Sequence, residues 1–264
     1  MKRTAAIVGM TLGLTAGLAA ANPSPLQGRD INGNAVGATD PSAVFEYDPN
    51  LNMTWLRDWN YAATSGYATT NAGGSGATQI NSSGTMGWDA AKTWASNLTV
   101  GSFSGWNLPT VTDTGEPGCN FDNVGTDCGF NVYGYGTNSP QAATLSPMAY
   151  LWYEELGNKA YYDTSGNHPL SGWGLENTGP FTNMQSAVYW SGTEYSRDRA
   201  WFFDTRNGLQ RSEYKLDALF AVAVLDCDVA NESCQAKHSV PIPATIALLS
   251  LGLVGIGVAR RKQA

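Results

Sequence analysis

The sequence predicts an α+β fold, in which a few helices pack beside a small antiparallel sheet. Three observations support this prediction. Aromatic and β-branched residues concentrate between positions 186 and 214. A nearly continuous apolar run follows from Leu219 to Leu225, and apolar residues recur at helical spacing between Gly87 and Leu98.

The first part of the folded chain contains two expected strands. Residues 22–50 are expected to be a lead-in, irregular from 22 to 42 and with an early strand from Ala43 to Tyr47. A second strand is expected from Met53 to Ala63, carrying Trp55 and Trp59. Residues 64–85 are rich in Gly, Ser, Thr and Asn, a composition typical of a flexible surface loop.

Two helices are expected. The first runs from Gly87 to Leu98, with Asp89 near the positive end of the helix dipole. The second runs from Pro147 to Leu156. Ser146 is a suitable N-cap for it, Pro147 suits the first helical position, and Gly157 is a typical stop.

The central hairpin is expected between 186 and 214. Ala187–Trp190 and Ala200–Asp204 have strand composition, and Asn207-Gly208 is the pair that a tight two-residue turn requires. The run Leu219–Leu225 has the pattern of a strand buried on both faces. We expect this strand to pair beside the hairpin.

The N-terminus has the three parts of a secretory signal peptide. Lys2 and Arg3 precede an uncharged apolar run, and Ala19-Ala20-Ala21 offers small residues at the cleavage position. We therefore expect residues 1–21 to be removed by signal peptidase after Ala21. An ordinary N-terminal helix is the alternative.

The C-terminus is predicted to cross a membrane. Residues 239–259 carry no charge and are long enough, as a helix, to span a hydrocarbon core of ~30 Å. The basic residues 260–262 that follow favour the cytoplasmic side, so the folded part is expected to face outward. A plain single-span anchor is one interpretation of this segment.

A more specific interpretation comes from the motif Val240-Pro241-Ile242-Pro243-Ala244, followed by the apolar span and by Arg260-Arg261-Lys262. Residues 240–264 resemble the PEP-CTERM sorting signal, although that family usually has Glu where Ile242 stands. The resemblance implies processing by an exosortase-type transpeptidase in a Gram-negative bacterium. It also implies brief anchoring in the inner membrane, then release to the cell surface or the extracellular matrix.

The middle of the chain contains, in order, a tryptophan-bearing helix, GWNLPT at 105–110, LWYEELGN at 151–158, YWSGTEY at 189–195, AWFFD at 200–204 and the final apolar run. The resemblance that these motifs carry, over residues 51–226, is to the DUF1566 family, also called the Lcl C-terminal domain. It implies a C-type-lectin-like domain with two helices and a small twisted antiparallel sheet carrying long loops, and no established catalytic residues. The family motif has Arg where Asn107 stands and Ser where Gly192 stands. Residues 227–239 are then expected to be a linker.

The charge distribution argues against nucleic acid as a partner. All 22 acidic residues but only 10 of the 15 basic ones lie between positions 22 and 239, which gives this part a formal charge of −12. A surface of this sign repels phosphate backbones.

The four cysteines form two close pairs, Cys119 with Cys128 and Cys227 with Cys234. Because the signal peptide directs the chain to an oxidising compartment, two local disulfides are the favoured interpretation. Zinc is the alternative, but the spacing is wider than in common zinc motifs and the two histidines, His168 and His238, are remote from such a pattern.

Catalytic chemistry has little support in the sequence. Histidine is scarce and no G-x-S-x-G motif occurs, which argues against a nucleophilic triad. Paired carboxylates for glycoside hydrolysis require only two acids a few ångströms apart. The candidates for such a pair are Glu154, Glu155, Glu194, Asp198 and Asp204.

Two binding sites are considered instead. Asp122 and Asp127, with nearby Asn side chains and backbone carbonyls, are weak candidates for Ca²⁺ ligands, although the spacing is not that of an EF-hand. Tyr161, Tyr162 and Trp173 lie in a polar, Gly-rich loop and are expected to be exposed, where they can stack on sugar rings.

The sequence thus favours a non-catalytic, exported protein that binds extracellular polysaccharide or contributes to the biofilm matrix. No cofactor is expected other than a possible Ca²⁺ ion. A surface hydrolase acting on polysaccharide and a purely structural surface protein are the alternatives.

Overall fold

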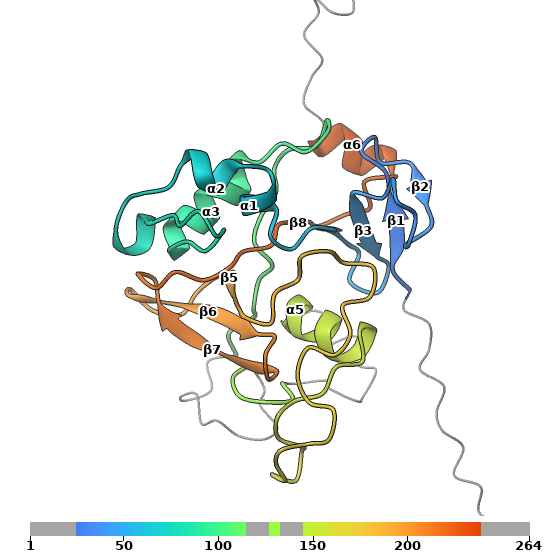
Figure 1. Cartoon of the computed structure of the whole chain (residues 1–264). Coiled ribbons are helices and arrows are strands. Elements are labelled where there is room, and N and C mark those ends of the chain that lie inside the picture. The colour runs from blue at the N-terminus through green and yellow to red at the C-terminus, as the bar shows by residue number, and fades with distance from the viewer. Residues whose placement is uncertain (1–24, 115–126, 133–144, 239–264) are drawn as a thin grey trace, which may run out of the picture.

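The computed structural model describes residues 25–114, 127–132 and 145–238, and two antiparallel sheets form its framework (Figure 1). The five-stranded sheet has the order β2-β1-β3-β4-β8. Its strands are β1 (Gln27–Arg29), β2 (Ala35–Val36), β3 (Phe45–Asp48), β4 (Met53–Leu56) and β8 (Val224–Leu225). The three-stranded sheet consists of β5 (Val188–Glu194), β6 (Arg199–Asp204) and β7 (Leu209–Tyr214). With the helices described next, these sheets confirm the prediction of an α+β fold.

The helices are short apart from one. They are α1 (Tyr61–Thr64), α2 (Tyr67–Thr70), the 3-10 helix η1 (Gly76–Thr78), α3 (Trp88–Asn97), α5 (Pro147–Tyr150), its π-helical continuation η2 (Leu151–Glu155) and α6 (Glu232–His238). Both predicted helices are confirmed. Ser146 caps α5 by accepting a hydrogen bond from the amide of Ala149 at 3.3 Å, and Gly157, with φ +67°, ends the continuation.

Two hydrophobic cores lie on opposite faces of the strands. The α3 core gathers around Trp88 and Trp94, and the α5 core gathers around Trp152. Neighbouring residues of β5 alternate between them, since Tyr189 belongs to the α5 core and Trp190 to the α3 core. Successive side chains of a strand point to opposite faces, so β5 is buried on both sides at Tyr189 and Trp190.

The apolar run Leu219–Leu225 connects the two sheets. Phe220 pairs with the inner edge of β5, as expected, through Phe220 N to Val188 O (3.0 Å) and Trp190 N to Phe220 O (2.9 Å). The run then leaves the hairpin, and only Val224–Leu225 forms a regular strand, paired with β4 in the other sheet. Burial on both faces is confirmed, because Ala221 to Leu225 are all at most 2% exposed and alternate between the two cores.

The predicted turn follows β6 but is longer than expected. Asp204 pairs with Leu209, so four residues, 205–208, form the loop, and of these only Gly208 has a positive φ. The prediction of a two-residue turn is therefore wrong. Asn207 instead caps the loop through its side-chain oxygen, which accepts a hydrogen bond from the amide of Leu209 at 2.9 Å.

Other sequence-based expectations differ from the structure near the N-terminus. The segment expected to be irregular, 22–42, contains β1 and β2, because β1 pairs with β3 and β2 pairs with β1. The second strand ends at Leu56 and not at Ala63, since α1 begins at Tyr61. The loop at 64–85 includes α2 and η1.

The segment expected to be a linker, 227–239, contains α6 up to His238. Cys234 and Val229 are at most 2% exposed and belong to the α3 core. Cys227 and Cys234 form the predicted disulfide. This segment is therefore packed against the sheet that carries β1 to β4 (Figure 1).

Several predictions fall outside the described residues. These are the signal peptide with Ala21, the sorting signal at 240–264 with its transmembrane helix, Cys119 and Asp122. Within 25–114, 127–132 and 145–238, no helix has both the length and the apolar character needed to cross a membrane. Cys128 is buried, and its pairing with Cys119 stays a prediction.

The loop after β6 provides a test of the fold. A Cβ at Gly208 would lie 2.9 Å from Trp152 and collide with the hydroxyl of Tyr153, and the backbone there has φ +80°. Gly208→Ala should therefore lower the free energy of unfolding by about 2 kcal/mol or more, measured by denaturant titration. Gly37→Ala is the matched control, because nothing lies within 4 Å of its added Cβ and its φ is not in the left-handed region. Equal effects of the two substitutions would contradict this account of the loop.

Candidate functional site

The predicted aromatic residues do come together, and with them an additional histidine. We define the aromatic patch as Tyr161, Tyr162, His168 and Trp173. The rings of Tyr161 and Trp173 meet edge to face at 4.9 Å, and His168 lies 5.5 Å from Tyr161 and 4.5 Å from Tyr162. Such edge-to-face pairs are favourable beyond the area they bury, so they hold the rings in fixed orientations.

Only part of the patch is as exposed as the sequence suggested. Trp173 is 40% exposed and His168 is exposed, whereas Tyr161 and Tyr162 are half-buried because they pack against the α5 core. Tyr162 also contacts the ring of Phe130 at 4.9 Å. The tyrosines thus anchor the patch, and Trp173 presents its surface to solvent.

The backbone of the loop fixes the patch on the rest of the protein. The amide of Tyr161 donates to the carbonyl of Asn207 at 2.9 Å, which ties the patch to the loop after β6. Gly174 N donates to Lys159 O (2.9 Å), and Trp173 N donates to Leu170 O (3.1 Å). These two bonds join the ends of the loop, and Trp173 lies beside them.

A polar turn lies beside the patch. Asp163 accepts hydrogen bonds from the amides of Ser165 and Asn167 and from the Asn167 side chain, all between 2.8 and 2.9 Å. These bonds hold the pKa of Asp163 below its usual value, and the bond from the Asn167 side chain has the largest effect. Asp163 is thus an anion at neutral pH and fixes the turn between Tyr162 and His168.

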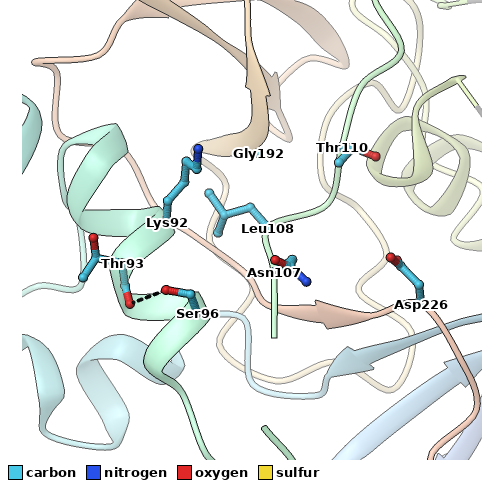
Figure 2. A pocket seen from close by; sticks show the side chains of 8 residues that line it. All are labelled: Lys92, Thr93, Ser96, Asn107, Leu108, Thr110, Gly192 and Asp226. Carbon is cyan, nitrogen blue, oxygen red and sulfur yellow. Dashed lines mark hydrogen bonds between the residues drawn. The ribbon is translucent and has the colours of Figure 1, made fainter. Parts of the chain in front are cut away.

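A second feature is a polar pocket of about 390 Å³ between α3, the GWNLPT segment and β5 (Figure 2). It is lined by Lys92, Thr93, Ser96, Asn107, Leu108, Thr110, Gly192 and Asp226. The Lys92 ammonium lies 4.3 Å from the centre of the Trp88 ring, and it has no carboxylate partner among the described residues. A pocket with hydroxyls, an amide and both signs of charge suits a small polar ligand.

Asn107 and Gly192 are both among the residues that line this polar pocket. A Cβ at Gly192 would lie 3.1 Å from the carbonyl oxygen of Leu108, which is a tight contact. The absence of a side chain at Gly192 therefore leaves space beside Leu108.

The acidic residues considered for hydrolysis are mostly engaged elsewhere. Glu194 pairs with Lys215 at 2.7 Å, and buried Asp204 pairs with Arg206 at 2.8 Å. Asp198 accepts a hydrogen bond from the hydroxyl of Ser196 at 2.8 Å. These three carboxylates therefore have structural roles in the three-stranded sheet and its loops.

One carboxyl pair joins Glu155, a candidate from the sequence, to Asp48, which is not among those candidates. Asn50 joins Asp48 and Glu155, because its backbone amide donates to Asp48 (2.9 Å) and its side chain donates to Glu155 (2.7 Å). Burial raises the pKa of Asp48 to about 7, with the Glu155 charge adding to the effect, and burial also raises the pKa of Glu155. A raised pKa is typical of a carboxyl group that acts as a general acid. Asp48 is fully buried, however, which argues against its contact with a substrate.

Glu46, two residues earlier on β3, is a further buried acid. Within the described part of the chain neither of its carboxyl oxygens has a hydrogen-bond partner, and the nearest Arg57 nitrogen, Nε, lies 3.6 Å away. Burial raises the pKa of Glu46 to about 8 against the opposing effect of Arg57. The sequence gives no signal for this, because Phe45-Glu46-Tyr47-Asp48 reads as an ordinary alternating strand with its acids facing solvent.

Three potential metal ligands come together at the second cysteine pair. Among the described residues, Cys227, Cys234 and His238 form a group whose potential ligand atoms lie within 4.8 Å of one another. The calcium candidate Asp127 is buried instead, and its carboxylate accepts two hydrogen bonds from Thr114, at 2.6 and 2.8 Å. The expectation that His238 is remote from a cysteine pair is wrong, because α6 places His238 beside Cys227 and Cys234.

Comparison of the chain with protein-family models, with curated proteins and with solved structures finds no match.

The buried acids of β3 predict a particular dependence of stability on pH. Because the pKa of Glu46 is raised in the folded state, the folded protein binds one more proton than the unfolded chain between about pH 4.5 and 8. The free energy of unfolding should therefore fall as the pH rises through this range, by up to about 1.4 kcal/mol per pH unit for one proton. Glu46→Gln should remove most of this slope in denaturant titrations at several pH values.

Asp48 acts in the same direction, so a smaller slope should remain in the Glu46→Gln variant. Glu176→Gln, at an exposed site, serves as the control and should leave the wild-type profile unchanged. A Glu46→Gln profile parallel to that of the wild type would show that Glu46 is ionised in the folded protein.

Proposed function

We propose that this protein is an exported, non-catalytic surface protein that binds extracellular polysaccharide through the aromatic patch. The observation that carries the proposal is the ring of Trp173, which is 40% exposed and held edge to face against Tyr161. A large apolar surface fixed in solvent lowers the entropic cost of binding. The C–H face of a pyranose ring is complementary to such a surface.

The surroundings of the patch support a saccharide over an apolar ligand. Polar and charged side chains flank Trp173 in the same loop, including Lys159, Asp163, Asn167 and Glu176. Sugar rings present apolar C–H faces and a rim of hydroxyls, so a site for them combines a flat aromatic ring with donors and acceptors at its edge. Loops held on a rigid scaffold are a common place for such sites.

The proposal extends to the architecture and the destination of the chain. A C-type-lectin-like domain of the DUF1566 type accounts for two helices around an antiparallel hairpin with long loops. The signal peptide and the PEP-CTERM-like tail at 240–264 account for export, for brief anchoring in the inner membrane, and for release by an exosortase-type enzyme. Binding to matrix polysaccharide is a function consistent with that destination.

A surface hydrolase is the second candidate, and the carboxyl pair of Asp48 and Glu155 is the observation that favours it. Both carboxyl groups have raised pKa values and share Asn50 as a donor. However, the side chain of Asp48 is buried. Hydrolysis of a glycan panel that is abolished by Glu155→Gln would favour this candidate, and a lack of turnover would reject it.

The binding proposal predicts a specific effect of Trp173. Trp173→Ala should weaken binding to the recognised polysaccharide about tenfold or more, equivalent to about 1.4 kcal/mol, because the stacking surface is lost. Glycan arrays would identify the polysaccharide, and isothermal titration calorimetry would measure its affinity. Tyr161→Ala should also weaken binding, because the Trp173 ring would lose the edge-to-face contact that fixes its orientation.

Tyr195→Ala provides a matched control for this experiment. Tyr195 is 38% exposed and its ring meets that of Trp201 edge to face at 5.2 Å, but it lies at the far end of β5. The substitution should leave affinity unchanged. Absence of saturable binding by the wild type, or equal loss in the Tyr195 and Trp173 variants, would favour a purely structural role.

Processing of the two ends gives an independent prediction. The mass of the protein recovered from its own cells should correspond to loss of residues 1–21 and of the tail near Val240. Reduction should add about 4 Da if both predicted disulfides form. Recovery of the full tail in the inner membrane would contradict sorting and would point to Ile242, in place of the usual Glu, as the first residue to test.

A further inference from the structure

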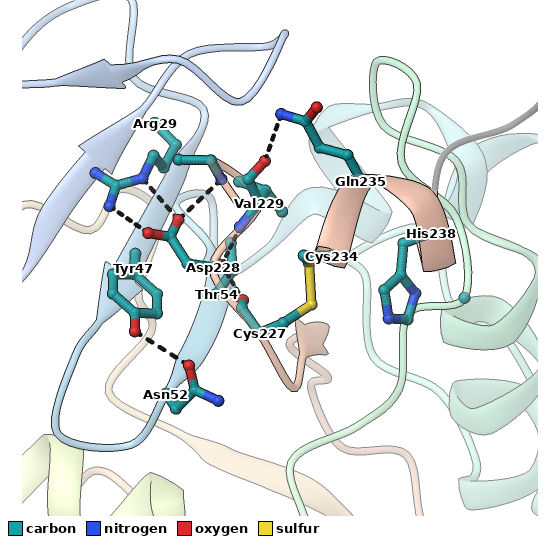
Figure 3. Close-up of a disulfide and its surroundings, with 12 residues drawn as sticks. Arg29, Tyr47, Asn52, Thr54, Cys227, Asp228, Val229, Cys234, Gln235 and His238 are labelled. Atoms are coloured by element: carbon teal, nitrogen blue, oxygen red, sulfur yellow. Dashed lines mark hydrogen bonds and ion pairs between the residues drawn. A yellow bond between two sulfur atoms is a disulfide. The ribbon is translucent and has the colours of Figure 1, made fainter. Parts of the chain in front are cut away.

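The cluster of Cys227, Cys234 and His238 has the composition of a metal site. Cys234 and His238 are four residues apart on α6 and therefore lie on one face of the helix, and Cys227 reaches the same face from the preceding loop (Figure 3). A ring nitrogen of His238 and the two sulfur atoms lie within 4.8 Å of one another. In the structure, a disulfide joins the two sulfur atoms.

The histidine is oriented as a metal ligand. Its Nδ1 lies 3.1 Å from the carbonyl oxygen of Ser104, and because a carbonyl can only accept, this contact assigns the proton to Nδ1. In the neutral ring Nε2 then carries a lone pair, and among the described residues this buried nitrogen has no hydrogen-bond partner, in a residue that is 8% exposed. Histidines that bind metals commonly donate their other ring N–H to a backbone carbonyl in this way.

The ring is further held by the chain around Ser104. The amide of Ser104 donates to the carbonyl of His238 at 2.7 Å, and the Ser104 hydroxyl donates to the same oxygen at 3.1 Å. A Cβ at Gly105 would lie 2.9 Å from Nδ1 of His238, so glycine leaves room for the imidazole. An uncompensated buried nitrogen in such a confined position is costly unless it has a ligand.

The segment that carries the cysteines is held in place by contacts other than the disulfide (Figure 3). Arg29 forms a bidentate pair with Asp228, with both N–O distances at 2.8 Å. The hydroxyl of Thr54 donates to the carbonyl of Cys227 at 2.6 Å. The side chain of Gln235 donates to Val229 at 3.0 Å, which joins α6 to this segment. The thiols should therefore stay close when the disulfide is absent.

We propose that the dithiol form of Cys227 and Cys234 binds, together with Nε2 of His238, a thiophilic divalent cation of the Zn²⁺ class. The dithiol form exists before the disulfide is made and after thiol–disulfide exchange with an external dithiol. In that exchange the protein disulfide takes up two electrons and two protons, and the external dithiol becomes a disulfide. Binding of the cation then releases the two thiol protons.

The ligand set determines the class of ion. Two thiolates and one imidazole match the preferences of Zn²⁺, and a water molecule in the fourth position completes a tetrahedron. The neighbouring Asp228 does not compete as a ligand, because Arg29 occupies both of its oxygens. Hard cations such as Ca²⁺ prefer six to eight oxygens and should not bind here.

The test uses the full chain, reduced under anaerobic conditions and titrated with Co²⁺ and then Zn²⁺. Co²⁺ in a tetrahedral site with thiolate ligands gives visible absorption and a sulfur-to-metal charge-transfer band. We expect one such site that Zn²⁺ displaces, in a Cys119→Ser/Cys128→Ser background that removes the other cysteine pair. The oxidised protein should not give these bands.

The two histidines provide a matched pair of variants. His238→Ala should weaken Co²⁺ binding about tenfold or more, and His168→Ala should leave it unchanged. A readout without histidine variants is ¹¹³Cd NMR of the reduced protein labelled with ¹⁵N-histidine, in which one Nε2 should couple to the cadmium. Lack of binding, equal binding by the His238 variant, or absence of the coupling would overturn the proposal.

Discussion

The fold depends on the burial of residues 219–225 on both faces. Their backbone groups are satisfied by four separate segments, for Leu219 bonds to Met86, Phe220 to β5, Ala223 to Leu56 and Val224 to Asn107. A buried segment can leave a hairpin only if each peptide group finds such a partner. The side chains meanwhile alternate between the α3 and α5 cores, and full burial of one Val or Leu contributes about 1.5–3 kcal/mol. This one segment therefore joins the two sheets and separates the two cores.

The same arrangement explains the unusual chemistry of β3. Glu46 and Asp48 lie on a face of β3 that the rest of the protein covers, so both are buried although they alternate with aromatic residues as surface acids would. Burial favours their neutral forms. Arg29 and Asp228, by contrast, satisfy each other through two hydrogen bonds and fix the start of the C-terminal segment to β1. The buried Arg29–Asp228 pair compensates its charges through these bonds, whereas burial raises the pKa of Glu46 to about 8 and that of Asp48 to about 7.

The candidate sites were predictable to different degrees. Tyr161, Tyr162 and Trp173 were identifiable because aromatic residues in a polar, Gly-rich loop have no periodic element in which to be buried. Their unequal exposure could not be predicted from the sequence, since it depends on the α5 core against which the tyrosines pack. The grouping of His238 with Cys227 and Cys234 was also not predictable. It requires α6 to fold back against Ser104, a residue more than 130 positions away in the chain.

The sequence by itself determined the α+β class, the positions of α3, α5 and the central hairpin, and the pairing of Cys227 with Cys234, because these depend on local periodicity, capping residues and short loops. It also carried the expectation of export and sorting, which rests on linear signals. Tertiary structure alone decided that residues 27–29 and 35–36 form strands, that the turn after β6 has four residues, and that a supposed linker contains a packed helix with a histidine beside the disulfide. These features depend on contacts between distant segments, and such contacts leave no periodic trace in the sequence.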